Sequence, residues 1–298
     1  MVAVPDFVAV GHVTKDILPD GGYSIGGTAT YASLTVHRLG LPVGVFTSIP
    51  LDLNLRGSLD GVVVHVVPSR SATTFENTYQ GSKRRQYVHG TATPLRPSGM
   101  PAAWRQAPIA LLCPIAGELN LEWLDTFPNT LVGVTPQGWM RQWDERGLVS
   151  PKPWCEADQI LPRVDVLVYS EEDVACDEDL IQHYAKLARI AVVTRGPRGA
   201  TVYWDGRPRD FPAFRAAAEF DPTGAGDVFA AAFLVRLKET GDPNVAAPFA
   251  NSAASFAVEG PGTTTIPTRS QVEERLQRGQ IVTGRKPLAP GGDPTGSP

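Results

Sequence analysis

The sequence predicts an α/β protein with a doubly wound, mainly parallel sheet flanked by helices. Short apolar runs alternate with helical segments along most of the chain, an order typical of parallel strands joined by crossover helices. A stretch rich in Val, Thr and Tyr at 62–89 predicts a small antiparallel lid sheet inserted into this body. The chain has 298 residues, of which 42% are hydrophobic and 19% are charged, so a largely disordered protein is excluded.

The first half of the chain predicts two strands around a helix, followed by the lid. An apolar run at 7–13 reads as a buried strand, and a Gly-rich turn at 21–27 follows it. Apolar residues then recur at helical spacing over 28–39, and Gly40 and Pro42 end this helix. A second strand is expected at 43–49. Lid strands are expected at 62–67, 72–79 and 84–89, with a hairpin turn at 80–82.

The second half returns to alternating strands and helices. Strands are expected at 109–115, 131–135, 164–169 and 190–194. Helices are expected at 177–189, 225–239, 244–258 and 269–277. The last stretch, 284–298, has four Gly and four Pro in fifteen residues without an apolar period, which predicts a disordered tail. Residues 1–283 are therefore expected to form a single domain.

Composition excludes several classes of function. Lys and Arg number 27 against 31 Asp and Glu, so a nucleic-acid binder working through net positive charge is not expected. Apolar runs stay far below the ~18 residues of a membrane span, and the N-terminus lacks the basic start of a signal peptide. Three cysteines without C-x-x-C spacing disfavour a disulfide framework and a structural zinc site. We expect a cytoplasmic protein without a membrane or nucleic-acid partner.

The segment 221–227, Asp-Pro-Thr-Gly-Ala-Gly-Asp, carries the strongest chemical signal. Gly224, Ala225 and Gly226 open a helix, and the first N–H groups of a helix lack internal partners and bind phosphates. Asp227 lies in the first turn. A carboxylate there can simply complement the helix dipole, but it can also take a proton from an attacking hydroxyl. Phosphoryl transfer needs this combination of a positioned base and donors for the transferring charge.

A rival motif occupies 22–26, where Gly-Tyr-Ser-Ile-Gly matches the G-x-S-x-G nucleophile elbow of hydrolases. That elbow requires an apolar strand directly before it and a helix directly after it. The preceding residues, 16–21, contain Pro19 and two acids instead. This context disfavours hydrolase chemistry.

The segment 221–227 is similar to the signature of the ribokinase-like carbohydrate kinases, also called the phosphofructokinase B type. Five of its seven positions are those that the family motif holds constant. Other features follow the family's order over about 5–279: a di-glycine before the first helix, an inserted lid, and a strand and turn at 194–200. The resemblance implies the ribokinase-like fold and a kinase that uses ATP and Mg²⁺.

The resemblance also implies roles for individual residues. Asp227 would be the general base, and the N–H groups of Gly224, Ala225 and Gly226 would hold the charge of the transferring phosphate. On the substrate side it implies Asp16, Gly26, Gly27, Thr28, Glu76, Asn77, Gln137 and Arg141. On the donor side it implies Thr194, Arg195, Gly196, Gly199, Thr223 and Asn251.

The chain departs from the family pattern at 170–173. The family often carries Asn-x-x-Glu there, linked to metal and phosphate, whereas this chain reads Ser-Glu-Glu-Asp. Because the Asn is gone and the acid is shorter, Asp173 is a weak candidate for a magnesium ligand. Gly260 and Gly262 lie where the family has a monovalent-cation loop, although ordinary turns explain them equally well.

The expected function is ATP-dependent phosphorylation of a hydroxyl on a small polyol or sugar. Two alternatives stay open, a nucleoside kinase of the same family and a catalytically silent binding relative. Nucleoside kinases usually have an apolar or aromatic base pocket, whereas this lid offers Glu76 and Asn77. Retention of Asp227 and both motif glycines argues against a silent relative. The open edges of a lid sheet leave room for a homodimer.

The substrate prediction is finer and depends on several segments together. The sequences at 73–77, 137–141, 170–172 and 202–204 resemble the myo-inositol kinase branch, although none of them is specific alone. A cyclic polyol presents only hydroxyls, so its site needs several charged or amide partners. Separate segments supply such groups, namely Asp16, Glu76, Asn77, Gln137 and Arg141. Glu76 and Arg141, taken singly, could equally be surface charges.

Overall fold

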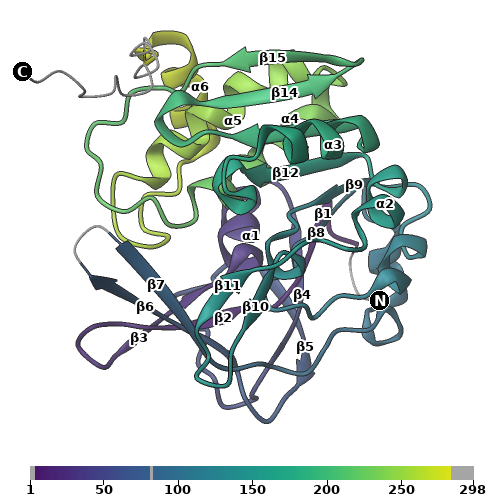
Figure 1. Ribbon diagram of the computed structural model, residues 1–298, viewed down its shortest axis with the longest axis vertical. Helices are drawn as coiled ribbons and strands as arrows, with labels where there is room; N and C mark the ends of the chain where they lie inside the picture. The colour runs from purple at the N-terminus through teal and green to yellow at the C-terminus, as the bar shows by residue number, and fades with distance from the viewer. Residues whose placement is uncertain (1–3, 81–82, 283–298) are drawn as a thin grey trace, which may run out of the picture.

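The computed structural model describes residues 4–80 and 83–282, so the tail predicted to be disordered lies outside the described residues. Its centre is a nine-stranded sheet in the order β15-β14-β13-β12-β9-β8-β1-β4-β5 (Figure 1). Neighbours from β5 to β13 are parallel, and β14 and β15 add an antiparallel edge. The strands are β1 (Phe7–Val10), β4 (Val43–Ile49), β5 (Val63–Pro68), β8 (Ile109–Leu112), β9 (Leu131–Val134), β12 (Val166–Ser170), β13 (Ile190–Thr194), β14 (Ala200–Trp204) and β15 (Arg207–Phe211).

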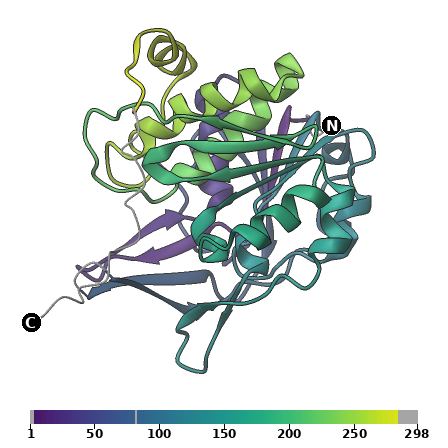
Figure 2. The same cartoon turned by 45° about the horizontal axis from the view of Figure 1, so that its top comes forward.

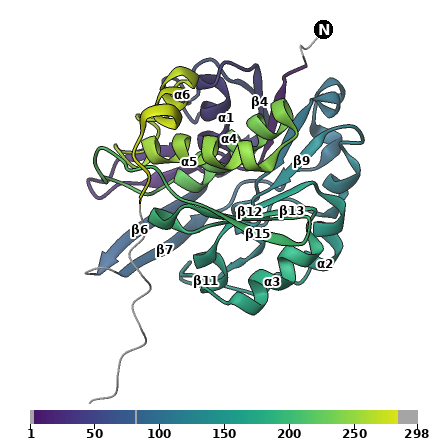
Figure 3. The same cartoon turned by 90° about the horizontal axis from the view of Figure 1, so that it is seen from above.

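Helices cover both faces of this sheet, which confirms the doubly wound prediction. Seen from above, α1, α4, α5 and α6 lie on one face, and α2 and α3 lie on the other (Figure 3). Their bounds are α1 (Thr28–Arg38), α2 (Ala157–Ile160), α3 (Glu178–Leu187), α4 (Ala225–Thr240), α5 (Pro243–Ala257) and α6 (Arg269–Arg278). Short 3₁₀ turns complete the connections at Pro97–Gly99, Ala102–Gln106, Leu121–Asp125, Gln137–Trp139, Leu161–Arg163, Glu171–Val174 and Gly196–Arg198.

The sequence of each element explains its place in the layers. All four residues of β1 and of β8 are buried, because helices on both faces shield a central parallel strand. Helix α4 buries nine of its sixteen residues and packs against α1, α5 and the sheet. A helix that is apolar on most sides can only be stable in such an interior position. Residues 228–235 of the helix are all buried, whereas Gly226 in its first turn is exposed.

The lid is a separate four-stranded sheet that projects from the body (Figure 2). It consists of β2 (Thr14–Ile17), β3 (Tyr23–Gly26), β6 (Thr73–Gln80) and β7 (Lys83–Gly90). Its β2–β3 and β6–β7 pairs are antiparallel, whereas β2 and β6 are parallel. A further two-stranded piece, β10 (Arg141–Trp143) with β11 (Val149–Pro151), lies beside the lid and reaches β7 through a bridge between Leu148 and Tyr87.

One of the strands predicted for the lid belongs to the main sheet instead, so that part of the prediction is wrong. The stretch 62–67 was expected in the lid, but β5 pairs with β4 and extends the main sheet. Two strands within 14–26 take its place in the lid. A run of Val around His65 suits either sheet, and the pairing partner is decided by which strand edge the chain reaches.

Among the residues that the structure describes, none of the helices has the length and apolar character needed to cross a membrane.

Candidate active site

A cavity of about 1150 Å³ lies where the parallel strands end, bordered by the lid on one side and by α4 and α5 on the other. Ligands of open α/β sheets bind at this carboxyl edge. The cavity brings together most of the residues predicted for substrate and donor. The predicted residues that line it are Asp16, Gly27, Thr28, Asn77, Gln137, Arg141, Asp173, Thr194, Arg195, Gly196, Gly199, Thr223, Gly224, Ala225, Gly226, Asp227 and Asn251.

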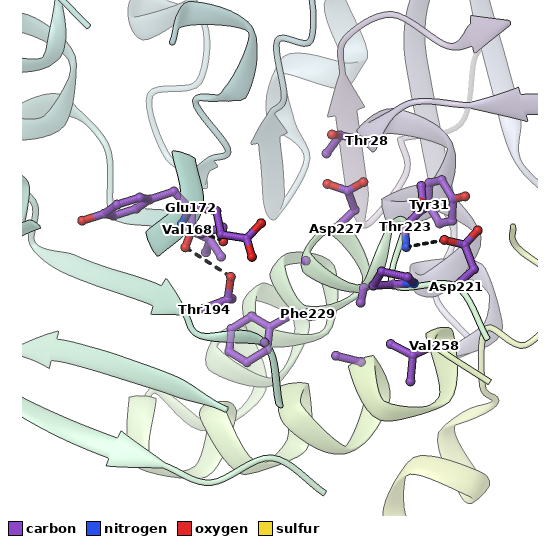
Figure 4. Close-up of a pocket in the computed structure, with 18 of the residues that line it drawn as sticks. Thr28, Tyr31, Val168, Glu172, Thr194, Asp221, Thr223, Asp227, Phe229 and Val258 are labelled. Atoms are coloured by element: carbon purple, nitrogen blue, oxygen red, sulfur yellow. Dashed lines mark hydrogen bonds between the residues drawn. The ribbon is translucent and has the colours of Figure 1, made fainter. Parts of the chain in front are cut away.

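Asp227 projects from the first turn of α4 toward Thr28 at the start of α1 (Figure 4). Burial raises the pKa of its carboxyl from 3.8 to about 7, although a hydrogen bond with Thr28 and the positive charge of Arg141 act in the opposite direction. The negative charge of Asp173 raises this pKa further. A base with a pKa near neutrality is well matched to taking a proton from a hydroxyl at physiological pH.

The three residues at the start of α4, 224–226, differ in their backbone conformation, their hydrogen bonds and the space around them. Gly224 has φ +81°, and a Cβ there would lie 2.2 Å from the ring of Tyr31, so the turn requires glycine. The N–H of Ala225 donates to the Pro222 carbonyl at 3.2 Å, so this group is not simply an open donor as predicted. A Cβ on Gly226 would meet nothing within 4 Å. Gly226 therefore leaves open space next to the helix end, where a phosphate would lie.

Gly26, the first of the two glycines before α1, lies next to the lid residue Asp16 and leaves room for its carboxylate. A Cβ on Gly26 would lie 2.0 Å from the Asp16 carboxylate, and Gly27 has φ +86° at the N-cap of α1. Gly26 itself does not line the cavity, but its missing side chain lets Asp16 enter it. The Thr14 hydroxyl donates to Asp16 at 2.9 Å and orients this carboxylate.

The two neighbouring lid residues predicted to bind substrate point to opposite faces of β6. Asn77 lines the cavity, whereas Glu76 does not and instead pairs with His89 at 2.6 Å. Successive side chains of a strand alternate between faces, so both cannot enter the same cavity. On the inner face, Gln86 of β7 donates to the Asn77 carbonyl oxygen at 3.1 Å and also lines the cavity.

The predicted donor side is built around a buried acid, Glu171. The Arg195 guanidinium donates to Glu171 at 2.8 Å and to Thr201 at 2.9 Å, and Arg198 donates to Glu171 as well. Burial would raise the pKa of Glu171, but its hydrogen bonds to the two arginines lower it below its ordinary range. The predicted donor residue Arg195 is thus anchored by the protein. It fixes the turn at 196–199 beside the cavity.

Asn251 of α5 holds another wall of the donor side. Its side-chain N–H₂ group donates to the carbonyls of Phe211 and Pro212 at 3.0 and 3.1 Å, and its exposed fraction is only 5%. Asn251 therefore positions the segment after β15 rather than offering these two donors to a ligand. That segment is also tied to the described end of the chain by a bridge between Phe214 and Ile281.

The residues around Asn251 leave an apolar slot beside the helix start. Its lining is Ala213, Phe214, Phe220, Ala254, Val258 and Val282. Phe220 is 70% exposed at the rim, while its backbone N–H donates to the Val258 carbonyl at 2.7 Å. The segment 170–173 closes the opposite side, where Asp173 accepts from the Ser170 N–H at 2.9 Å.

Sequence reasoning missed Gln86, Thr135 and Phe220 among the lining residues. Gln86 could have been found, because β6 and β7 pair as antiparallel neighbours in a register that sets Asn77 opposite Gln86. Phe220 directly precedes the motif at 221–227, but nothing in the sequence marks it as a rim residue. Thr135 gives no signal, since a Thr that ends a strand is ordinary.

Comparisons with known proteins bear on this geometry. Residues 148–269, which contain the helix start and the donor side, match the pfkB family of carbohydrate kinases. This match identifies a pfkB carbohydrate-kinase segment within the chain. The family match and the matched relatives make the chain a kinase of the carbohydrate and nucleoside type.

Two curated relatives of this chain are kinases of different acceptors. A cytidine kinase from Thermococcus kodakarensis is 28% identical over 77% of this chain and 87% of its own length. An inositol 3-kinase from Arabidopsis thaliana is 25% identical over 90% of this chain and 79% of its own length. A pyrophosphate-dependent ribokinase-family kinase, solved with a pyrophosphate analog and myo-inositol, shares the fold with a TM-score of 0.76 and 23% identity, covering 90% of this chain and 99% of that one.

Proposed function

We propose that this kinase transfers the terminal phosphate of ATP to a hydroxyl of a small polyol, with myo-inositol as the acceptor. The observation that carries the proposal is the acceptor half of the cavity, where side chains that bind hydroxyls line the same cavity as Asp227. These side chains are Asp16, Asn77, Gln86, Gln137 and Arg141. Such a set can bond several hydroxyls of one ring. We further propose that the enzyme acts in the cytoplasm.

The reaction follows from the positions of these groups. Asp16 and the lid amides hold the polyol so that one hydroxyl faces Asp227, which takes its proton. The N–H groups at the start of α4, apart from that of Ala225, would face the phosphate that is transferred, and the helix end would stabilise its charge. The lid, once closed over the acceptor, would exclude water and limit ATP hydrolysis.

Magnesium fits this site as an ion held largely by the nucleotide. Within 4–80 and 83–282, no group of three or more His, Cys, Asp or Glu side chains could hold a metal ion. One oxygen of Asp173 is already bonded to the Ser170 N–H, which leaves the other for an ion or its water. Mg²⁺ usually keeps several waters and binds through phosphates and one or two carboxylates. When bound, it would neutralise charge on the donor phosphates.

A nucleoside triphosphate fits the donor side better than pyrophosphate does. The apolar slot around Phe214 and Val258 lies beside the phosphate-binding helix start and offers a surface for a base. Pyrophosphate has no apolar part that would use it. Kinases of this family use ATP and typically Mg²⁺, which supports the same donor.

The acceptor is tested by an activity panel on the wild-type protein. Product formation is measured with ATP and equal concentrations of myo-inositol, ribose, fructose, adenosine and cytidine. We expect the highest kcat/KM with myo-inositol. A preference for cytidine or adenosine would favour the nucleoside kinase alternative, which the similarity to a cytidine kinase supports. A preference for ribose or fructose would reject myo-inositol but leave a sugar kinase.

The donor is tested through Phe220. Phe220→Ala is expected to raise the KM for ATP about tenfold, because stacking of a base on an aromatic ring contributes roughly 1–3 kcal/mol. The KM for the acceptor should stay unchanged. Leu51→Ala serves as the control, since Leu51 is 78% exposed and does not line the cavity. An unaltered ATP KM in Phe220→Ala, or efficient turnover with pyrophosphate in place of ATP, would contradict the nucleotide assignment.

A further inference from the structure

Thr135 is a buried residue that lines the cavity. It directly follows β9 and is 7% exposed, and it lines the cavity near the residues that lead to Arg141. Its Oγ1 has no hydrogen-bond partner among the described residues. A buried hydroxyl without a partner costs about 1–3 kcal/mol relative to one that is bonded. The folded protein therefore carries a cost here that a bound molecule could remove.

Other buried threonines of the chain show how a hydroxyl is ordinarily satisfied. Thr30 and Thr35 of α1 donate to carbonyls one turn earlier, at 2.6 and 2.7 Å. Thr126, which is 7% exposed like Thr135, donates to the Glu122 carbonyl at 3.2 Å. Thr73 bonds His12 at 2.7 Å. Compared with these bonded threonines, the Thr135 hydroxyl lacks a partner among the described residues, and Thr135 lines a cavity. This combination indicates that a ligand, and not internal packing, supplies its hydrogen bond.

The position of Thr135 places this ligand on the acceptor side. In the sheet, β9 lies between β8 and β12, while the donor wall starts beyond β12 at the end of β13. The chain after Thr135 is pressed against the end of β8, where the Gly138 N–H donates to Pro114 at 2.8 Å. The next residue there, Ile115, packs against Phe75 of the lid. Thr135 thus lies on the β8–β9 side of the cavity wall, next to a segment that contacts the lid.

We infer that Thr135 is an acceptor-binding residue whose hydroxyl bonds a hydroxyl of the polyol. A hydroxyl both donates and accepts, so it matches a second hydroxyl in either direction. Because Thr135 and Asp227 lie on the same cavity, this bond helps to select which hydroxyl of the ring faces the base. The inference rests on the proposed function, since it requires a hydroxyl-bearing acceptor.

The test is Thr135→Val, which keeps the shape of the side chain and removes the hydroxyl. We expect kcat/KM for the acceptor to fall about tenfold or more, since a site that has lost one hydrogen-bonding partner binds its polar ligand less well. The KM for ATP should stay within about twofold. The melting temperature should not fall, because the variant breaks no bond within the protein. Thr135→Ser should restore most of the acceptor kcat/KM.

The matched control is Thr126→Val, at a threonine of equal burial whose hydroxyl is bonded. It should lower the melting temperature and leave both KM values unchanged. The inference is overturned if Thr135→Val leaves the acceptor KM and kcat unchanged, or if the ATP KM changes instead. If Thr135→Val does not fold, an unaltered acceptor-induced rise in melting temperature for Thr135→Ala would overturn it as well.

Failure of the proposed function would look different. Wild-type protein that phosphorylates no polyol but accepts a nucleoside or sugar rejects the polyol assignment. The same Thr135 variants, assayed with that acceptor, then still decide whether the hydroxyl binds it.

Discussion

Replacing Asp227 with asparagine is expected to lower kcat by ~10²–10⁴-fold, the typical contribution of a positioned general base. The amide keeps the size of the side chain and can still bond Thr28, but it cannot take the proton. Turnover is measured at saturating ATP and acceptor. A kcat within about threefold of the wild type would remove Asp227 from the mechanism, because that change corresponds to only ~0.65 kcal/mol.

The pH dependence provides a second readout for Asp227. Its raised pKa of about 7 means that only the carboxylate above this pH is an active base, so wild-type kcat/KM should rise with pH and level off above about 7. For stability the sign is the reverse. The folded state binds the proton more tightly than the unfolded chain does, so this group stabilises the fold below 3.8 and loses that contribution as pH rises through about 7.

Asp227→Asn should therefore be more stable than the wild type at pH 8, by about 1 kcal/mol or more. The two melting temperatures should converge as pH is lowered toward 4. Thermal denaturation at several pH values measures this difference. An Asn variant that is less stable than the wild type at pH 8 would show that burial of the charged Asp227 carboxylate does not destabilise the folded protein.

Substituting the two glycines of the helix start should separate folding from phosphate binding. Gly224→Ala is expected to destabilise the protein by ~1–3 kcal/mol, because φ +81° is unfavourable for alanine and its Cβ would lie 2.2 Å from Tyr31. Gly226→Val meets open space and should keep its melting temperature near that of the wild type. Its branched side chain would enter the space for the phosphate, and we expect ATP-dependent kcat/KM to fall by about a hundredfold.

Equal melting temperatures for Gly224→Ala and wild type would contradict the steric argument at Gly224. ATP affinity and turnover that both survive in Gly226→Val would show that the phosphate does not lie against this helix end. Circular dichroism and thermal denaturation measure the first comparison, and steady-state kinetics with varied ATP measure the second.

Local sequence was sufficient wherever neighbours along the chain decide the structure. The predicted helices at 28–39 and 225–239 agree with α1 and α4 to within one residue at each end. Their boundaries depend on glycines and apolar spacing, which are local properties. The seven-residue motif at 221–227 likewise predicted the start of α4, and the candidate base Asp227 belongs to the same helical turn.

The assignment of strands to sheets required tertiary structure. The stretch 62–67 has the composition of any strand, and the structure shows that it extends the main sheet instead of the lid. In the same way, alternation along β6 turns Glu76 to His89 and Asn77 to the cavity, but the sequence alone does not say which face is inner. Such choices depend on which distant segment packs against each face.

The sequence by itself determined the family motif, the alternating α/β order and the candidate base, because each depends on residues that are close together along the chain. Only the tertiary structure decided that Asn251 and Arg195 are held by backbone and acid partners, since those partners lie 24–40 residues away. It also decided that Thr135 lines the cavity and that its hydroxyl has no partner among the described residues. Whether a hydroxyl is bonded depends on every atom around it, and that environment is assembled only when strands from the whole chain meet at one edge of the sheet.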